Sequence, residues 1–367
     1  MSKKVYMILT NGFDPDVRVY KEAKYLVEKE YDVEILCWDR KCEYKEKTEE
    51  IIDGIKIKRF HILSQPGTGM KQLGAYLKFM INISKYLKKE KCFYLHCHDL
   101  DGAIVGYITS TFKPKVKFVF DMHELYTTEE FSYGKFKIII KVLINQIYKR
   151  SYKIIYVNEE QVLTISNKNK NKLIYLPNYP EICNYMPIEK EKNNKCRINY
   201  VGAIRDYDSL KALIDLGKKQ IEYSIGLYGT GTAYGQIKEM RLPPNIMLYG
   251  QYNGITDIAE IYRKTDILFC SYNPNNYNWK IAYPVKFFES IITMTPIIVS
   301  EGTKVAEFVK DNKIGEAVRY GDSKSICAAI ERIEKRYEEY VKNIRKISDM
   351  YKWEKIVDRL SSVYKEK

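Results

Sequence analysis

The segment Tyr283-Pro-Val-Lys-Phe-Phe-Glu-Ser-Ile-Ile-Thr-Met-Thr-Pro-Ile-Ile-Val-Ser300 joins a short helical pattern to an apolar run typical of a buried strand. Lys286 and Glu289 stand three residues apart, so on a helix they share one face. This pair suits a nucleotide sugar, because a cation can meet the diphosphate while a carboxylate accepts hydrogen bonds from ribose hydroxyls. An ordinary surface Lys–Glu pair is the competing interpretation.

The same alternation of apolar strands and helices extends in both directions from this segment. Alternation of this kind predicts mostly parallel sheets covered by helices. A helix is expected to begin with Asp14 as its N-cap and Pro15 as its first residue, and another over 71–89 has an apolar side. That side consists of Leu73, Leu77, Met80, Ile81 and Ser84. The expected strands are 4–9, 32–37, 55–60, 93–95, 117–120 and 153–157, then 197–201, 224–228, 246–248, 267–270 and 296–299.

A polar, proline-containing break divides this pattern into two halves. We expect a first domain over 1–180, a linker over 181–195 and a second domain over 196–350. A final helix over 351–367 is expected to cross back to the first domain. Ligands of open parallel sheets bind beyond the carboxyl ends of the strands, so a cleft between the two halves is expected.

Composition narrows the class of protein. With 45% hydrophobic and 29% charged residues the chain is globular, and its eight scattered cysteines form no CxxC pair. The N-terminus lacks a signal-peptide pattern, and the apolar runs are far shorter than the roughly 20 residues that span a bilayer. We therefore expect a cytoplasmic protein. The net charge of +14 suggests an anionic partner, although an overall bias towards lysine also explains it.

Three glycine-containing strand ends are candidate ligand sites. Asn11-Gly12 follows the first strand, where a glycine lets a substrate approach the backbone. Val201-Gly202-Ala-Ile-Arg205 offers a guanidinium for phosphate, and Lys211 either assists it or is a solvated helix residue. Gly229-Thr-Gly231 has the wrong spacing for a dinucleotide fingerprint, yet its backbone N–H groups can hold a phosphate.

Three of the four histidines, His96, His98 and His123, fall at strand ends. A metal site with Asp99 or Glu124 is conceivable, but His96 and His98 are expected to face opposite ways and no strong metal-ligand spacing is present. We therefore expect no metal. His123 is interpreted as a substrate contact and His96 as structural.

Together these motifs resemble glycosyltransferase family 4, a family of sugar-nucleotide-dependent enzymes with the GT-B fold. That fold has two Rossmann-like α/β domains whose parallel sheets face a central cleft. The resemblance covers nearly the whole chain and is strongest to the branch that builds surface or lipid-linked polysaccharides. It rests on Asn11-Gly12-Phe13-Asp14 with Arg18, His98-Asp99, Asp121-Met-His123-Glu124-Leu125, Val201-Gly202-Ala-Ile-Arg205, Gly229-Thr-Gly231 and Pro284-Val-Lys286-Phe-Phe-Glu289.

The resemblance implies a retaining, metal-independent transfer from a nucleotide-diphosphate sugar to a glycan or lipid-linked acceptor, with no resident cofactor. It implies that Arg205 and Lys286 contact the diphosphate, that Glu289 takes the ribose hydroxyls and that His123 contacts the donor sugar. The other donor-side residues would be Gly12, Gly202, Lys211, Gly229 and Gly231, and the acceptor-side residues Asn11, Arg18, His98, Asp99 and Glu124.

One position departs from the family pattern. The family often has two glutamates separated by seven residues, but Ile281 stands where the first would be. The group that holds the sugar hydroxyls is therefore not identified, and the donor sugar stays open.

Two other functions remain as alternatives. A sugar-nucleotide 2-epimerase shares the architecture and would act on the donor without an acceptor. A basic nucleic-acid-binding protein would need aromatic residues interleaved with arginine, whereas here tyrosines are spread evenly and lysine dominates.

The segment 135–153 holds six basic residues and no acidic one. Ile139, Val142, Leu143 and Ile147 form one helical stripe along it. Basic amphipathic helices bind anionic surfaces, which predicts docking of the first domain on the inner face of the cell membrane. The same stripe can instead be the face that packs on the sheet.

Overall fold

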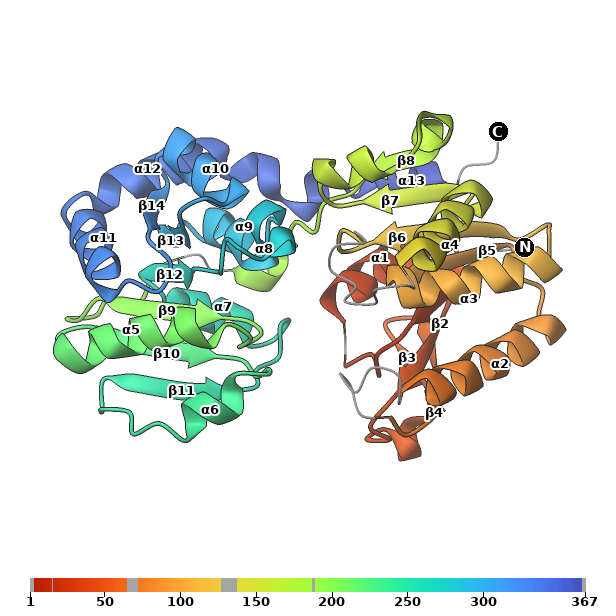
Figure 1. Cartoon of the computed structure of the whole chain (residues 1–367), viewed down its shortest axis with the longest axis horizontal. Helices are drawn as coiled ribbons and strands as arrows, with labels where there is room; N and C mark the ends of the chain where they lie inside the picture. The colour runs from red at the N-terminus through yellow and green to blue at the C-terminus, as the bar shows by residue number, and fades with distance from the viewer. Residues whose placement is uncertain (1–2, 15, 65–71, 127–136, 187–188, 365–367) are drawn as a thin grey trace. The chain divides into compact units, whose positions relative to one another are not determined.

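The structure is a computed structural model of the whole chain and describes residues 3–14, 16–64, 72–126, 137–186 and 189–364. The chain forms two compact units (Figure 1). The first comprises Met1–Pro177 and Val357–Lys367, and the second comprises Asn178–Ile356. Residues 181–195, expected to be a linker, thus belong to the second unit, and the last residues of the chain belong to the first.

The first unit is built on an eight-stranded sheet of order β3-β4-β2-β1-β5-β6-β7-β8. Only β3 and β4 pair antiparallel; the other neighbours are parallel. Six of its strands lie where the sequence predicts them: β1 (Lys4–Leu9), β2 (Asp32–Asp39), β4 (Ile55–His61), β5 (Tyr94–His98), β6 (Lys117–Met122) and β7 (Lys153–Tyr156). The two edge strands, β3 (Glu49–Ile52) and β8 (Leu173–Tyr175), were not predicted: β3 has only two apolar residues, and β8 is only three residues long.

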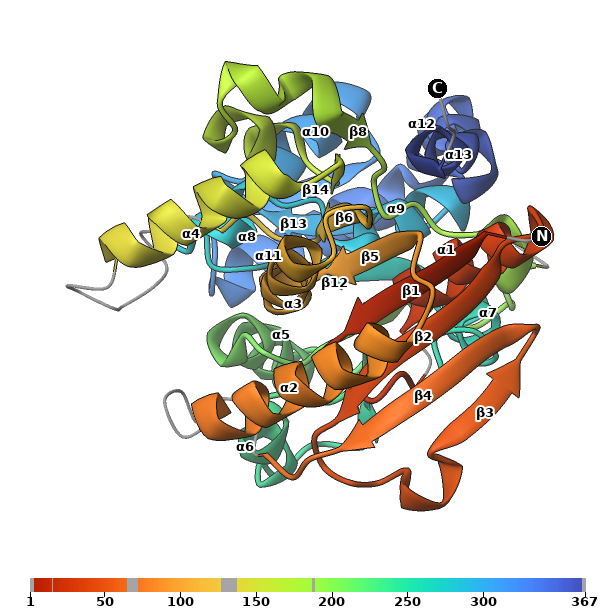
Figure 2. The same ribbon diagram turned by 90° about the vertical axis from the view of Figure 1, so that its right-hand side faces the viewer.

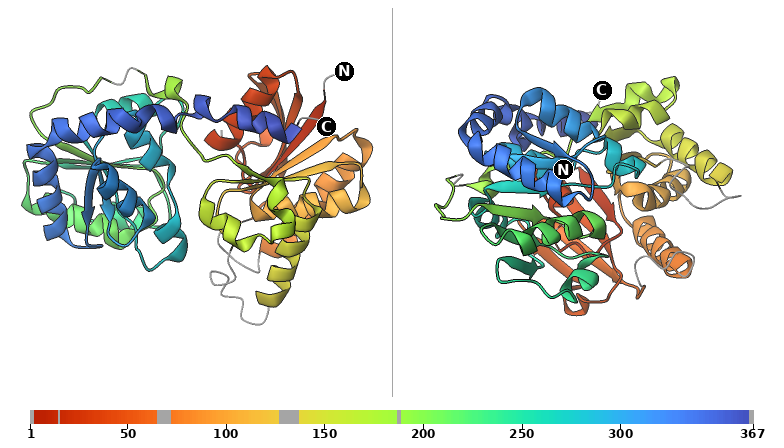
Figure 3. Two further views of the ribbon diagram at one scale, coloured as in Figure 1. Left: turned by 90° about the horizontal axis from the view of Figure 1, so that it is seen from above. Right: turned by 60° about the vertical axis from the view of Figure 1, so that its left-hand side comes forward.

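Helices cover both faces of this sheet (Figure 2). On one face α2 (Leu73–Lys89), α3 (Asp99–Phe112) and α4 (Lys137–Arg150) pack into a single core with the strands. On the other lie α1 (Val17–Glu28) and the C-terminal α13 (Asp358–Tyr364), side by side (Figure 3). The Tyr25 hydroxyl of α1 donates to Asp358 of α13, which ties the end of the chain to its beginning.

The start of α1 differs from the expectation. Its N-cap is Asp16, whose side chain accepts a hydrogen bond from the Val19 N–H, and not Asp14. The loop before it is longer than expected, because the Asn11 side chain accepts from the Phe13 N–H and closes a turn there. Pro15 lies outside the described residues.

The second unit has a six-stranded sheet of order β11-β10-β9-β12-β13-β14, parallel throughout. The segment 283–300 forms α9 and then β13, the expected helix and buried strand. The expectation of two α/β domains with parallel sheets is confirmed. The strands are β9 (Arg197–Val201), β10 (Ser224–Tyr228), β11 (Ile246–Gly250), β12 (Ile267–Cys270), β13 (Ile297–Ser300) and β14 (Gly315–Val318). The helices are α5 (Tyr207–Lys219), α6 (Tyr234–Lys238), α7 (Ile258–Arg263), α8 (Tyr277–Ile281), α9 (Val285–Ile292), α10 (Lys304–Asn312), α11 (Ser323–Lys335) and α12 (Tyr337–Ile347).

Candidate functional site

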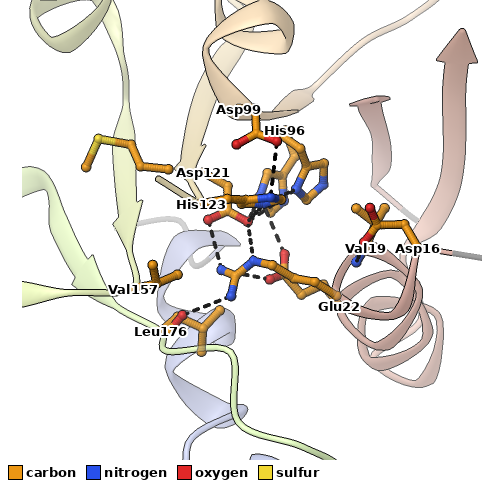
Figure 4. Close-up of polar contacts among 12 residues, drawn as sticks. Asp16, Val19, Glu22, His96, Asp99, Asp121, His123, Val157 and Leu176 are labelled. Carbon is orange, nitrogen blue, oxygen red and sulfur yellow. Dashed lines mark hydrogen bonds and ion pairs between the residues drawn. The ribbon is translucent and has the colours of Figure 1, made fainter. Parts of the chain in front are cut away.

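A buried cluster of charged side chains lies at the carboxyl ends of β5 and β6 (Figure 4). The Arg18 guanidinium donates to both oxygens of Asp121, at 3.0 and 2.9 Å. It also pairs with Glu22, one turn along α1, at 3.1 Å. Burial opposes the ionised form of Asp121, but Arg18 and His123 outweigh it and hold the pKa of Asp121 well below its usual range. The cluster is therefore built around a charged Arg18–Asp121 pair.

His96 and His98 lie on the same side of β5, with ring centroids 4.5 Å apart. The expectation that they face opposite ways was wrong, because side chains two positions apart on a strand share a face. Both are fully buried, and burial lowers the pKa of each imidazole. His98 Nδ1 is 3.2 Å from Asp121 Oδ2.

His123 is the member of the cluster that reaches the surface, with 19% of its side chain exposed. Its Nε2 lies 3.2 Å from Asp121 and its Nδ1 lies 3.3 Å from Asp99. Burial opposes protonation, but the two carboxylates outweigh it and raise the pKa of His123 well above its ordinary value. Tyr126 donates to the other oxygen of Asp99 at 2.7 Å and so fixes that carboxylate. At neutral pH the cluster therefore presents an imidazolium at the sheet edge.

The residues expected on the acceptor side fall into two groups. Arg18 and His98 are buried inside the cluster, where they position their neighbours. Asp99 and Glu124 have exposed surface, and Asn11 lies in the loop after β1, where its amide donates to Asp16 at 3.1 Å. Only the second group is placed to meet a ligand directly.

Gly12 borders a pocket of about 350 Å³ at the ends of β1 and β2. A methyl group on Gly12 would come within 3.2 Å of the Tyr44 ring, so the glycine keeps the pocket open. Asp39 in its wall is already engaged, because it accepts hydrogen bonds from the Glu43 and Tyr44 N–H groups.

Four side chains of metal-ligating type converge in the buried cluster: Glu22, His96, His98 and Asp121, with one ligand atom of each within 4.8 Å of the others. Arg18 already contacts both carboxylates of this set. A divalent ion bound here would have to share those carboxylates with the guanidinium, which is unfavourable for two cations at such short range.

Sequence reasoning missed Tyr364, in the last turn of α13. Its hydroxyl is 2.7 Å from His96 Nδ1, so the C-terminal helix completes the base of the cluster. Burial raises the pKa of Tyr364 well above its usual value, which keeps the phenol neutral. No local pattern could reveal this contact, because the partners are 268 residues apart.

In the second unit, Lys286 is a buried cation at the start of α9. Its Nζ has no hydrogen-bond partner among the described residues, and it lies 3.5 Å from the centre of the Tyr200 ring. A methyl group on Gly202 would stand 3.1 Å from Nζ, so this glycine leaves the ammonium group uncovered on that side. Buried charges are normally paired or hydrogen-bonded, which makes Lys286 the strongest candidate for an anion contact.

Glu289 does not pair with Lys286 as an ordinary surface pair would. Its carboxylate oxygens instead accept hydrogen bonds from the Tyr185 and Tyr262 hydroxyls, at 2.7 and 2.8 Å. A carboxylate oxygen can accept more than one hydrogen bond, so these two contacts are compatible with a ribose hydroxyl as a further donor. Ile281, at the position of the family's first glutamate, is buried at the end of α8.

The two glycines after β10 have a packing role. A methyl group on Gly229 would lie 2.0 Å from the Gly202 carbonyl oxygen, and one on Gly231 would lie 2.4 Å from that of Ile204. Both have positive φ, 120° and 159°. The Gly229 N–H is already used, because it donates to the Gly250 carbonyl. These glycines are therefore explained by the close approach of two loops.

Arg205 and Lys211 differ in their availability. Arg205 is exposed in the loop before α5, and Asp206 beside it is anchored by accepting from the Asn273 N–H and the Tyr320 hydroxyl. Lys211 is exposed on α5 and pairs with Asp215 one turn later, at 2.6 Å. Of the two interpretations of Lys211, its position fits a solvated helix residue.

Comparison with known proteins follows the division into two units. Residues 16–177 match the family model described as Glycosyltransferase Family 4, and residues 184–349 match the one described as Glycosyl transferases group 1. A search of curated protein sequences found no match.

Solved structures share the whole architecture at low sequence identity. Sucrose-phosphate synthase from Thermosynechococcus elongatus superposes with a TM-score of 0.77 at 13% identity, covering 99% of this chain and 98% of that one. Anabaena HepE, solved in complex with UDP and glucose, has a TM-score of 0.70 at 12% identity, with 99% of each chain covered. WaaG, a glycosyltransferase involved in lipopolysaccharide biosynthesis, has a TM-score of 0.66 at 10% identity, covering 99% of this chain and 100% of that one.

Proposed function

Because this chain is a family 4-like glycosyltransferase with the GT-B fold, we propose that it moves a sugar from a nucleotide-diphosphate donor to a glycan or lipid-linked acceptor. The pathway we propose is the synthesis of a surface polysaccharide or glycoconjugate. HepE is described with UDP and WaaG with lipopolysaccharide biosynthesis, which supports this choice of donor and pathway.

The observation that carries the proposal is the buried, uncovered ammonium group of Lys286 beside Gly202. Departure of a nucleoside diphosphate develops charge on its phosphate oxygens, and fixed cations in a desolvated site stabilise that charge. In this proposal Lys286 and the exposed Arg205 bind the diphosphate. Glu289, held by two tyrosines, accepts from the ribose hydroxyls.

In the first unit, His123 is the proposed contact for the transferred sugar, with Asp99, Glu124 and Asn11 on the acceptor side. Its imidazolium can donate a hydrogen bond to a sugar hydroxyl while Asp99 and Asp121 hold the ring. We propose that the transfer retains the anomeric configuration and needs no metal, since Arg18 neutralises the carboxylates that could bind one.

The test is an assay with a panel of nucleotide sugars, with and without glycan and lipid-linked acceptors. We expect acceptor-dependent release of nucleoside diphosphate and a product with the donor's anomeric configuration. Conversion of the donor to its 2-epimer without an acceptor would instead establish the epimerase alternative.

A peripheral membrane location is part of the proposal. None of the described helices is long and apolar enough to cross a bilayer. In α4, Ile147 of the predicted stripe is buried in the core, but Ile139 and Val142 are exposed beside Lys141. Lys135 lies outside the described residues. We expect Ile139→Glu to weaken binding to anionic vesicles, and unchanged binding would restrict α4 to core packing.

A further inference from the structure

An apolar groove runs between α2 and α3 of the first unit, with a volume of about 710 Å³. Its walls include Leu77, Met80 and Ile81 of α2 and Ile108 and Phe112 of α3. Three of these side chains are unusually exposed for their size: Leu77 at 45%, Ile81 at 53% and Phe112 at 82%. Contiguous exposed apolar surface of this kind marks an interaction site.

The apolar side that the sequence predicts for α2 is the one that lines this groove. The helix is anchored to the sheet by other residues, Phe79, Ile83 and Leu87, which are fully buried. The helix therefore has two apolar faces, and the core accounts for only one. The volume of the groove is within the range of ligand-binding pockets, roughly 300–1,000 Å³.

The charged residues that line the groove are all lysines. Lys85 and Lys88 line it, both exposed and without an ion pair among the described residues. Helix α2 has four lysines and no acidic residue, and α4 on the same face of the sheet has three lysines, one arginine and no acidic residue. The two acidic residues of α3, Asp99 and Asp101, are confined to its first turn.

We propose that this groove binds a hydrocarbon chain of an anionic bilayer lipid, with Lys85 and Lys88 contacting the headgroup phosphate, and so docks the first unit on a membrane. The inference deepens the proposed peripheral location and rests on it. A second copy of the chain is a poorer occupant, because a two-fold interface would bring the same lysines of both copies together. An aqueous polar ligand would leave the exposed aliphatic side chains uncovered.

The experiment is co-sedimentation of the full chain with phosphatidylglycerol–phosphatidylcholine vesicles and with phosphatidylcholine vesicles alone. We expect binding only to the anionic vesicles. The double variant Leu77→Glu, Ile81→Glu should bind at least about 10-fold more weakly, and each of Lys85→Gln and Lys88→Gln about 5-fold more weakly. The matched control is Ile221→Glu, which changes an isoleucine in the second unit that is more exposed than Ile81, 67% against 53%. All variants should keep the wild-type melting temperature, because the altered side chains are exposed.

Insertion into hydrocarbon is separated from simple charge adsorption by a fluorescence measurement. In Phe112→Trp, lipids brominated in their acyl chains should quench the added indole emission relative to wild type. Absence of that quenching, or wild-type vesicle binding by the Leu77/Ile81 double variant, would overturn the proposal. So would a wild-type chain that ignores anionic vesicles but dimerises through Phe112.

The same samples are tested for a melting-temperature shift with UDP, ADP and GDP. A nucleotide response without vesicle binding means that the groove proposal fails while the transferase proposal stands. Vesicle binding without any nucleotide response means that the transferase proposal fails while the groove proposal stands.

Discussion

Replacing Lys286 by methionine should stabilise the ligand-free protein and remove most of its stabilisation by nucleotide. Lys286 is 6% exposed, and its ammonium group lacks a hydrogen bond among the described residues. The contact of the ammonium group with the Tyr200 ring, 3.5 Å away, offsets part of the cost of burying the charge and is worth about 1–2 kcal/mol. Methionine keeps the length of the side chain and fills the same space without the desolvated charge. Such a conflict between stability and function is common at binding sites.

The two expected effects have opposite signs. Removing an unpartnered buried charge, and with it the contact to Tyr200, should raise the free energy of unfolding by about 1 kcal/mol. For a unit of this size that is about 2–4 °C in melting temperature. Losing a charge-assisted phosphate contact should cost about 2–3 kcal/mol in binding, or about 30- to 150-fold in Kd.

The assay is thermal unfolding with and without the nucleoside diphosphate that stabilises the wild type. At a ligand concentration about 100 times the wild-type Kd, wild type gains about 2.7 kcal/mol. A variant with about 100-fold weaker binding gains only about 0.4 kcal/mol at that concentration. Lys218→Met, on the exposed surface of α5, is the control and should respond like wild type.

The result that refutes this reasoning is a Lys286→Met protein that melts below wild type and still responds fully to nucleotide. It would mean that the ammonium group makes a stabilising contact in the folded protein and leaves the diphosphate to other residues.

Three further predictions concern the rest of the two units. Asp99→Asn should lower the pKa of His123, because it removes one of the two carboxylates that stabilise the imidazolium. The stability contributed by the charged His123 is present below its unfolded-state pKa and is lost as the pH rises through its folded-state pKa, so in the variant it should be lost at a lower pH. NMR titration of the imidazole measures this pKa. Burial lowers the pKa of Lys190 to about 7. Between pH 7 and 9 Lys190 is therefore protonated in the unfolded chain and mostly neutral in the folded one, so the free energy of unfolding should rise by about 2–3 kcal/mol over this range. Urea unfolding at the two pH values should show this rise in wild type and not in Lys190→Met. Transferase activity should survive EDTA, whereas loss restored by a divalent ion would show that the reaction needs a metal; the Glu22–His96–His98–Asp121 cluster would then be the first site to test by mutation.

The sequence predicted most of the fold because the signals were local. Buried parallel strands read as short apolar runs, and the two domains follow from their repetition. The strands β3, β8 and β14 were missed because their signal is short: β3 and β14 have only two apolar residues each, and β8 is only three residues long. The N-cap of α1 was assigned to the wrong residue because two aspartates, Asp14 and Asp16, lie just before the helix. Only the turn closed by the Asn11 side chain makes Asp16 the N-cap.

Site residues could be predicted where a motif of neighbouring residues identifies them. Contacts between residues far apart in the sequence could not be predicted. Lys286 and Glu289 were found from their spacing, but that spacing suggested a pair. In the structure each has its own aromatic surroundings: the Tyr200 ring for the cation, and the Tyr185 and Tyr262 hydroxyls for the carboxylate. A tyrosine ring stabilises a cation without supplying the hydrogen bonds that a phosphate would, whereas tyrosine hydroxyls fill part of a carboxylate's capacity. Lys286 therefore still needs an anion, while Glu289 is already oriented before any ribose arrives.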